Sequence, residues 1–524
     1  MPYVDVPMTE GNWDPKNQGR LDRFMRAINY SKIWRYWHAW DKSGGYGDRD
    51  PANVRAHLRG GLAYAIYPAV ACVQSATGDL EPHRAWYRQY VPAIEELSTA
   101  GWEPVPYAKA TEGVVVERFG DYARGELHFT LRNYTDRPVE TVLTPDWKSL
   151  GVPTAGELVA IDIVPRTPQL VPVAREGFRV ALDPDGSRAF WLGTRPQAAQ
   201  HGFRLAAATL EKLRRLFAVE MQLVSKAAPK ASVGTAQESH ATVEMAAWDA
   251  AAQIARAGAG AEGRAALDQA ESLQRAAARV ATDFKTRAPV DLQKLLFRLR
   301  AEVSLVPVAL LGLELQAPRV VADARRGQTA AVAARFAVGA TKLGGLEFHA
   351  VSPWPEVAEQ SSVRAAAPAP TGRLTTLEAG LSVPADPPRR LMPCLLEARG
   401  TADGAPFTIA TPVDVQVGAP LEVALSPERV VRGQASRLKL SIANRLAAGG
   451  RLTVAFGLPA KTTLEPSTWN VPIAGQAAVD REVTLTLDHN VPIGELRITY
   501  RITGDDPRFN TQGPIFLSVD APKD

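Results

Sequence analysis

Acidic residues lie in and directly after the first short apolar run of the chain. Asp5 lies within the run Tyr3 to Pro7, and Glu10 follows in the segment Thr9-Glu10-Gly11-Asn12-Trp13. Cleavage of a glycosidic bond generally uses two carboxyl groups, one as acid and one as nucleophile or base, about 5 to 9.5 Å apart. Asp5 and Glu10 are therefore our candidate catalytic residues. The alternative is that each caps the following helix or lies in solvent.

Aromatic and polar side chains gather in the same part of the chain. Trp13, Trp37, His38, Trp40 and Asp41 are our candidates for substrate binding. Tryptophan rings offer flat apolar platforms to the faces of sugars, and their N–H groups donate hydrogen bonds. The alternatives are that these tryptophans pack between helix and barrel, and that the histidine is a hydrogen-bonded residue of the core or rim.

These residues need a scaffold that brings the ends of successive strands together. Within residues 1–107, short apolar runs alternate with helical patterns over Gly19 to Asn29, Pro51 to Arg59 and Pro82 to Leu97. This alternation is typical of parallel βαβ units, in which the loops after the strands form the site. A closed barrel has eight such units and only three are found, so we expect a partial (β/α) barrel. We also expect Met1 to lie inside a longer domain, or a complementary barrel chain to be a partner.

The remaining sequence indicates four further domains, and so a multidomain α/β plus all-β protein. Strand runs and turns over 108–200 favour an antiparallel β-sandwich, and the Ala- and Leu-rich segment 201–303 favours two or three long helices. The motif Arg326-Gly327-Gln328 recurs as Arg432-Gly433-Gln434, 106 residues later. That spacing is about the size of an immunoglobulin-like sandwich, so we expect two of them, over 304–418 and 419–524.

Composition excludes several classes of function. The chain has 60 Lys and Arg against 56 Asp and Glu, with the signs interleaved, so we expect no nucleic-acid partner. Cys72 and Cys394 define neither a disulfide framework nor a metal site. Phosphate-binding, zinc-protease and serine-hydrolase motifs are absent, so we expect no metal and no cofactor. No apolar run is long enough for a membrane span, and residues 1–10 lack the pattern of a secretory signal.

Several motifs resemble a known family in both content and order. The runs Tyr90 to Leu97 and Ala100 to Pro104 resemble the final barrel helix and exit of bacterial (β/α)8-barrel glycoside-hydrolase-like proteins. The runs Val116 to Gly120 and His128 to Asn133 resemble the start of the sandwich that follows such barrels. The last domain resembles the alpha-galactosidase-associated immunoglobulin-like accessory domain. Its matching motifs are Leu440-Ser441-Ile442-Ala443-Asn444, Gly457-Leu458-Pro459, Leu464-Glu465-Pro466 and Val491-Pro492-Ile493-Gly494.

The resemblance implies the C-terminal portion of a carbohydrate-active protein that acts on a polysaccharide or glycoconjugate. It also implies a secreted or periplasmic location for a full-length relative, whose catalytic pair can lie partly on the missing strands. The alternative is a non-catalytic glycan-binding or cell-surface structural protein with a vestigial barrel.

Overall fold

The structure is a computed structural model in which the chain forms two compact units. The first comprises Met1–Val321, Ala331–Gly380 and Pro393–Asp414, and the second comprises Ala322–Ala330, Leu381–Met392 and Val415–Asp524. Among the described residues, no helix is long and apolar enough to cross a membrane. The described residues are 8–10, 23, 24, 26, 27, 34–37, 51–68, 84–153, 156–164, 170–227, 235–284, 290–318, 320–324, 328–338, 343–351, 363–364, 375–384, 391–417, 420–446, 448–506 and 509–522.

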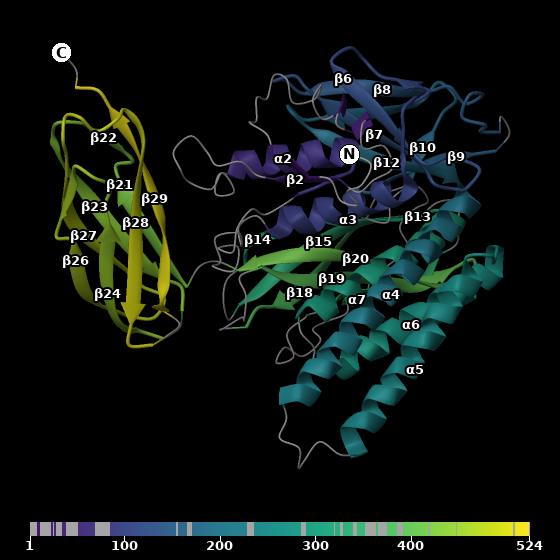
Figure 1. The fold of residues 1–524 in the computed structure, drawn as a ribbon. Coiled ribbons are helices and arrows are strands. Elements are labelled where there is room, and N and C mark those ends of the chain that lie inside the picture. Colours follow the sequence, from purple (N-terminus) through teal and green to yellow (C-terminus); the bar gives the residue numbers. More distant parts are fainter. Residues whose placement is uncertain are drawn as a thin grey trace. The chain divides into compact units, whose positions relative to one another are not determined.

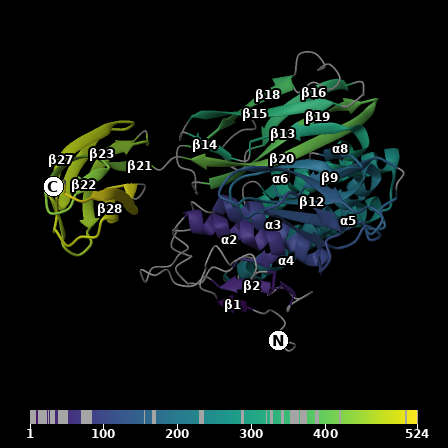
Figure 2. The same cartoon turned by 90° about the horizontal axis from the view of Figure 1, so that it is seen from above.

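The first unit begins with a small parallel sheet and two helices (Figure 2). Its strands are β1 (Met8–Glu10), β2 (Trp34–Trp37) and β3 (Ile66–Tyr67), and its helices are α2 (Pro51–Tyr64) and α3 (Arg84–Ala100). The middle strand, β2, runs parallel to both neighbours, as the alternation of strands and helices predicted. The strand expected over Tyr3 to Pro7 lies outside the described residues.

An antiparallel β-sandwich follows, as expected. One sheet has the order β10-β9-β12-β7-β6-β4 and the other has the order β11-β8-β5. The strands are β4 (Trp102–Glu103), β5 (Ala108–Lys109), β6 (Val114–Phe119), β7 (Leu127–Asn133), β8 (Val139–Pro145), β9 (Leu158–Asp162), β10 (Leu170–Val173), β11 (Phe178–Leu182) and β12 (Ser187–Thr194). Leu127, Phe129 and Leu131 of β7 are fully buried and pack against Leu143 of β8 in the core between the sheets.

Both faces of β7 are covered, so all seven of its residues are buried. One face points into the sandwich core, and α2 and α3 pack against the strand outside that core. The Thr130 hydroxyl, for example, donates a hydrogen bond of 2.7 Å to the carbonyl of Ala63 in α2. The polar residues of this strand must therefore find partners within the protein.

The helical segment begins earlier and contains more helices than the two or three expected. It starts at Arg195, directly after β12, because the buried apolar positions Ala198, Ala199 and Phe203 already follow a helical repeat there. The helices are α4 (Arg195–Ala227), α5 (Thr235–Gly258), α6 (Gly263–Phe284), α7 (Val290–Val303) and α8 (Leu305–Leu311). Within this segment α4 packs against α5 and α7, and α6 packs against α5 and α7 (Figure 1). Helix α8 also packs against α4.

Two more sheets come next, in the orders β13-β15-β18 and β14-β20-β19-β16-β17. Their strands are β13 (Leu313–Gln316), β14 (Val320–Ala324), β15 (Thr329–Val338), β16 (Leu343–Val351), β17 (Val363–Arg364), β18 (Thr375–Ser382), β19 (Leu391–Ala402) and β20 (Ala405–Val417). Helix α7 packs against this region, since Arg300 forms a buried ion pair with Glu397 of β19. Next to it, the Ser304 hydroxyl accepts a hydrogen bond of 2.7 Å from the backbone N–H of Ala410.

The second unit is built mainly of two further sheets, in the orders β21-β23-β27-β25 and β22-β29-β28-β24-β26. The strands are β21 (Leu421–Ser426), β22 (Arg429–Val431), β23 (Ala435–Asn444), β24 (Gly450–Gly457), β25 (Thr462–Glu465), β26 (Thr468–Ile473), β27 (Ala478–Leu487), β28 (Gly494–Gly504) and β29 (Thr511–Asp520). Apolar residues from both sheets, among them Leu440, Val454 and Ile498, form one core. The chain is thus a multidomain, β-rich protein with mixed secondary structure.

Candidate functional site

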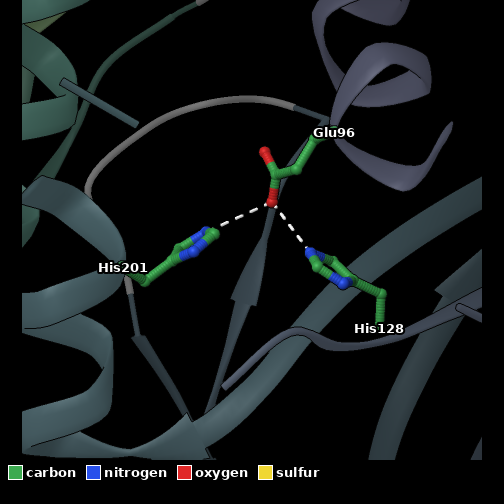
Figure 3. A group of neighbouring side chains, drawn as sticks. All are labelled: Glu96, His128 and His201. Carbon is green, nitrogen blue, oxygen red and sulfur yellow. Dashed lines mark hydrogen bonds and ion pairs between the residues drawn. The ribbon is translucent and has the colours of Figure 1, made fainter. Parts of the chain in front are cut away.

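Three titratable side chains meet inside the first unit, each from a different element (Figure 3). Glu96 comes from α3, His128 from β7 and His201 from α4. We call these three residues the Glu96 cluster. Glu96 Oε1 lies 2.9 Å from His128 Nε2, with hydrogen-bond geometry, and 3.2 Å from His201 Nε2, at ion-pair distance but without that alignment. The three side chains are only 8%, 2% and 5% exposed.

Helix α3 places Glu96 at the margin of a buried apolar face. Ala93, Ile94 and Leu97 are fully buried in the core of the first unit. Glu96 lies three residues after Ala93, so the two share one side of the helix. The helix ends at Ala100, and Gly101 follows with a φ of +89°, which suits glycine, and an N–H that donates to the Leu97 carbonyl at 3.0 Å. The carboxylate is therefore carried into the protein by the same face that anchors the helix.

A backbone carbonyl sets the orientation of the His128 ring. His128 Nδ1 lies 2.7 Å from the carbonyl oxygen of Glu126. Because a carbonyl only accepts hydrogen bonds, Nδ1 carries a proton and Nε2 is the nitrogen that faces Glu96. With a carboxylate as its second partner, the ring donates from both nitrogens when it is the imidazolium.

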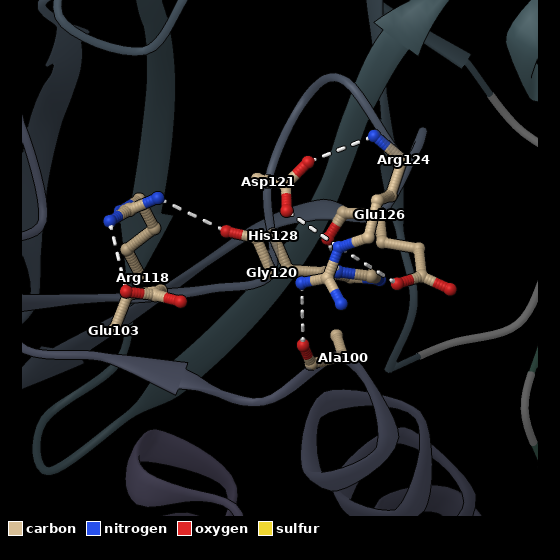
Figure 4. A network of polar contacts seen from close by, with 8 residues as sticks. All are labelled: Ala100, Glu103, Arg118, Gly120, Asp121, Arg124, Glu126 and His128. Atoms are coloured by element: carbon tan, nitrogen blue, oxygen red, sulfur yellow. Dashed lines mark hydrogen bonds and ion pairs between the residues drawn. The ribbon is translucent and has the colours of Figure 1, made fainter. Parts of the chain in front are cut away.

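The turn between β6 and β7 holds that carbonyl in place (Figure 4). The Glu126 N–H donates to the Asp121 carbonyl at 3.0 Å, which closes the turn. Arg124 Nε donates to Asp121 Oδ2 at 2.6 Å, and Arg124 Nη2 donates to the Ala100 carbonyl at 3.4 Å. The turn is thus tied to the end of α3, the helix that also carries Glu96.

The His201 ring is held by an aromatic neighbour. It stacks on Trp191 of β12, with ring centroids 4.9 Å apart and an interplanar angle of 13°. Trp191 Nε1 donates to the Gly125 carbonyl at 2.9 Å, and Arg204 Nη2 donates to the same oxygen at 2.8 Å. The turn before β7 therefore supports both imidazole rings of the cluster.

Burial and mutual charge determine the ionisation of the cluster. Burial on its own raises the pKa of Glu96, but the neighbouring His201 and His128 outweigh it and hold that pKa well below its usual value. Burial lowers the pKa of His201, and the negative charge of Glu96 opposes that change only in part. The Glu96 carboxylate is therefore ionised, and the two imidazoles are the groups that stabilise its charge.

A cavity of about 480 Å³ reaches the cluster. Glu96 and His201 both line it, together with the cationic side chains of Arg88, Lys294 and Arg298. Most of its remaining wall is apolar, which is usual for a small-molecule site. The cluster is thus buried and yet adjoins a space that water or a small ligand can enter.

The candidate residues of the parallel sheet are described only in part. Asp5, Trp13, His38, Trp40 and Asp41 lie outside the described residues. Glu10 is the last residue of β1 and Trp37 is the last residue of β2, and the register pairs them directly. Tyr67, the last residue of β3, pairs with Arg35 of β2.

Sequence reasoning did not identify the Glu96 cluster. Glu96 and His128 both lie in the motifs that carry the family resemblance, but no spacing rule links either of them to His201. One signal was present, because His201 lies among the buried apolar positions of the helical repeat in α4.

No protein-family model and no curated protein matches this chain. The solved structures it resembles include the native alpha-2-macroglobulin of E. coli, at 15% identity over 40% of this chain and 17% of that one, with a TM-score of 0.21. They also include red sea bream transglutaminase, at 16% identity over 40% and 31% of the two chains, with a TM-score of 0.26. A C. elegans MSP family member, WR4, aligns at 12% identity over 19% of this chain and 97% of that one, with a TM-score of 0.15. The chain thus spans about a fifth of the macroglobulins it matches, and at these scores the likenesses carry no argument about fold or function.

Proposed function

We propose that this chain is the C-terminal portion of a carbohydrate-active, glycoside-hydrolase-like protein that acts on a polysaccharide or glycoconjugate. In this proposal β1, β2 and β3 belong to a partial (β/α) barrel, and the later sheets form two immunoglobulin-like sandwiches. A full-length relative would be secreted or periplasmic, and the missing strands would come from upstream sequence or from a complementary chain.

The register of the parallel sheet is the observation that carries the proposal. Glu10, Trp37 and Tyr67 are the last residues of β1, β2 and β3, so they share the carboxyl edge of the sheet. In parallel α/β architectures the active site forms at this edge. Glu10 would supply one of the two carboxyl groups that sugar cleavage uses, and Trp37, which pairs with it, would supply an aromatic residue for sugar stacking. Tyr67 pairs with Arg35, two residues before Trp37.

Glu10 is accordingly the better supported of the two catalytic candidates. It pairs directly with Trp37 across the strands, whereas Asp5 lies outside the described residues. Neighbouring parallel strands are about 4.8 Å apart, so a sugar unit bound at this edge can contact both residues at once. Glu10 would then supply one carboxyl group, with its partner carboxylate on another loop or strand.

The test uses the full chain and a panel of polysaccharides, with bound glycan and released reducing ends measured separately. We expect Glu10→Gln to abolish release while glycan is still retained, and Trp37→Ala to weaken retention. Two variants are matched controls: Glu112→Gln, at an exposed residue, and Trp147→Ala, at a residue that packs against the sandwich core. Both should leave glycan retention and the release of reducing ends unchanged.

Each outcome decides between the alternatives. Retention of glycan without release by the wild-type chain would overturn the catalytic proposal in favour of a glycan-binding protein with a vestigial barrel. A chain that neither retains nor cleaves any glycan of the panel would overturn both.

A further inference from the structure

We propose that the Glu96 cluster binds one divalent transition-metal ion of the zinc class. The argument rests on Glu96, His128 and His201 alone and is independent of the carbohydrate proposal. These residues are fully described and lie within a single compact unit.

The ligand atoms already converge as a metal requires. One oxygen of Glu96 and one nitrogen of each of His128 and His201 all lie within 4.8 Å of one another. Zinc bonds of about 2.0 to 2.2 Å place tetrahedral ligands about 3.4 Å apart. The two separations from Glu96 Oε1, 2.9 and 3.2 Å, differ from this by no more than about 0.5 Å. Small side-chain shifts would therefore admit an ion between them.

The surroundings of the histidines match those of metal ligands. A ligating histidine almost always donates its second ring N–H to a carbonyl or carboxylate, which fixes the tautomer. His128 donates from Nδ1 to the Glu126 carbonyl at 2.7 Å, so Nε2 is the nitrogen presented to the cluster. His201 is held by Trp191, and its Nε2 has no aligned hydrogen bond. The tautomer of His128 and the ring plane of His201 are thus set by groups outside the cluster.

The number and kind of ligands indicate the ion. Two imidazoles and one carboxylate form the three-ligand set of zinc sites that keep one position open. Mg²⁺ and Ca²⁺ prefer oxygen ligands, and two of these three ligands are nitrogens. Glu96 and His201 line the cavity of about 480 Å³, from which a water molecule can supply the fourth ligand. We therefore expect Zn²⁺ to bind, Co²⁺ to replace it, and Mg²⁺ to bind weakly or not at all.

The competing explanation is that the three residues only form a buried ion pair that ties α3, β7 and α4 together. Such a cluster would need no metal, because contacts with the two imidazoles would stabilise the charge of Glu96. The two explanations differ in measurable ways, since only the first predicts saturable binding of one ion per chain.

The first experiment is titration of the full, untagged, chelator-treated chain with Zn²⁺ by calorimetry. We expect one Zn²⁺ per chain, and we expect Co²⁺ to give the visible absorption of a four-coordinate site. Glu96→Gln and His201→Gln should each weaken Zn²⁺ affinity by more than about 100-fold, because loss of an outer-shell partner alone costs about 10- to 100-fold.

His349→Gln is the matched control. His349 Nε2 lies 3.4 Å from Glu347 Oε2, so these two residues form a histidine–glutamate pair outside the cluster. Among the described residues, this pair has no third side chain placed to complete a metal site. This variant should retain wild-type affinity. A wild-type chain that binds neither Zn²⁺ nor Co²⁺ would overturn the proposal without reliance on any variant. Unchanged Zn²⁺ affinity in a folded His201→Gln chain, with folding checked by circular dichroism, would overturn it as well.

Discussion

Gly120 is the position where a single methyl group should disturb the support of the Glu96 cluster. Its φ is +65°, in the left-handed region. A Cβ at this position would overlap the carbonyl oxygen of Glu126, and it would lie 3.0 Å from that carbonyl carbon and 3.2 Å from Ala100 Cβ. Because this oxygen accepts the hydrogen bond from His128, Gly120→Ala must move the group that orients the ring.

A Gly151→Ala variant is the control that separates the clash of the added Cβ from the cost of a left-handed backbone at alanine. The φ of Gly151 is +67°, almost the same as that of Gly120, yet a Cβ there would meet no atom within 4 Å. Alanine in the left-handed region costs about 1 to 2 kcal/mol at either position. Gly120→Ala should also lose the hydrogen bond from His128, and weaken the one between the Glu126 N–H and the Asp121 carbonyl. Together these are worth about 2 to 4 kcal/mol, so this variant should be less stable than Gly151→Ala by that amount.

Native-state hydrogen exchange of β7 is the assay, because it reports local opening in a chain too large for simple two-state unfolding. An additional cost of about 2 to 4 kcal/mol corresponds to exchange in β7 that is roughly 30- to 700-fold faster in Gly120→Ala than in Gly151→Ala. Equal exchange in the two variants would refute the reasoning, because it would show that the Glu126 carbonyl can move at no cost.

Two buried carboxylates give further predictions. Arg300→Met should destabilise the first unit in chemical unfolding, but by less than the about 3 to 5 kcal/mol that an unpaired buried charge costs, because the fully buried Glu397 would lose one ion pair and keep the one with the half-exposed Arg399. The double variant with Glu397→Met should recover much of this loss, and an equal loss in both would contradict the prediction. Burial raises the pKa of Glu117 despite its hydrogen bond from Trp102, so the folded state holds this proton more tightly than the unfolded state. Stability should therefore fall as pH rises above the usual glutamate pKa, and Glu117→Gln should be more stable than wild type near pH 7.5 but not near pH 4. A difference between them that does not vary with pH would count against this.

The elements that follow simple periodicity were predictable from the sequence. Strand β8 alternates between buried and exposed residues, as a strand with one covered face must, and it lies in the segment where strands were expected. The parallel order of β1, β2 and β3 also followed from alternating strands and helices. In these cases a local pattern and the final packing favour the same structure.

Strand β7 shows where local pattern fails. Its sequence, LHFTLRN, alternates in the manner of a strand with one face in water, yet every residue is buried. The polar face is covered by helices that precede it in the chain, and each polar side chain has at least one partner there or within the sandwich. Thr130 donates to Ala63, and His128 contacts Glu96. Whether this face is covered depends on how α2 and α3 dock on it. The alternation of polar and apolar residues within β7 carries no information about that docking.

The same reason explains why the Glu96 cluster could not be predicted. Its members are separated by 32 and 73 residues and come from a helix, a strand and a second helix, so no motif spacing joins them. Their meeting requires that α3 docks on β7 and that α4 begins directly after β12. A buried carboxylate is costly unless it has partners, so Glu96 is tolerated in this apolar core only because the two imidazoles, or a metal ion held with them, stabilise its charge. The cluster is therefore a consequence of tertiary packing, and saturable Zn²⁺ binding is the observation that distinguishes a metal site from a buried ion pair.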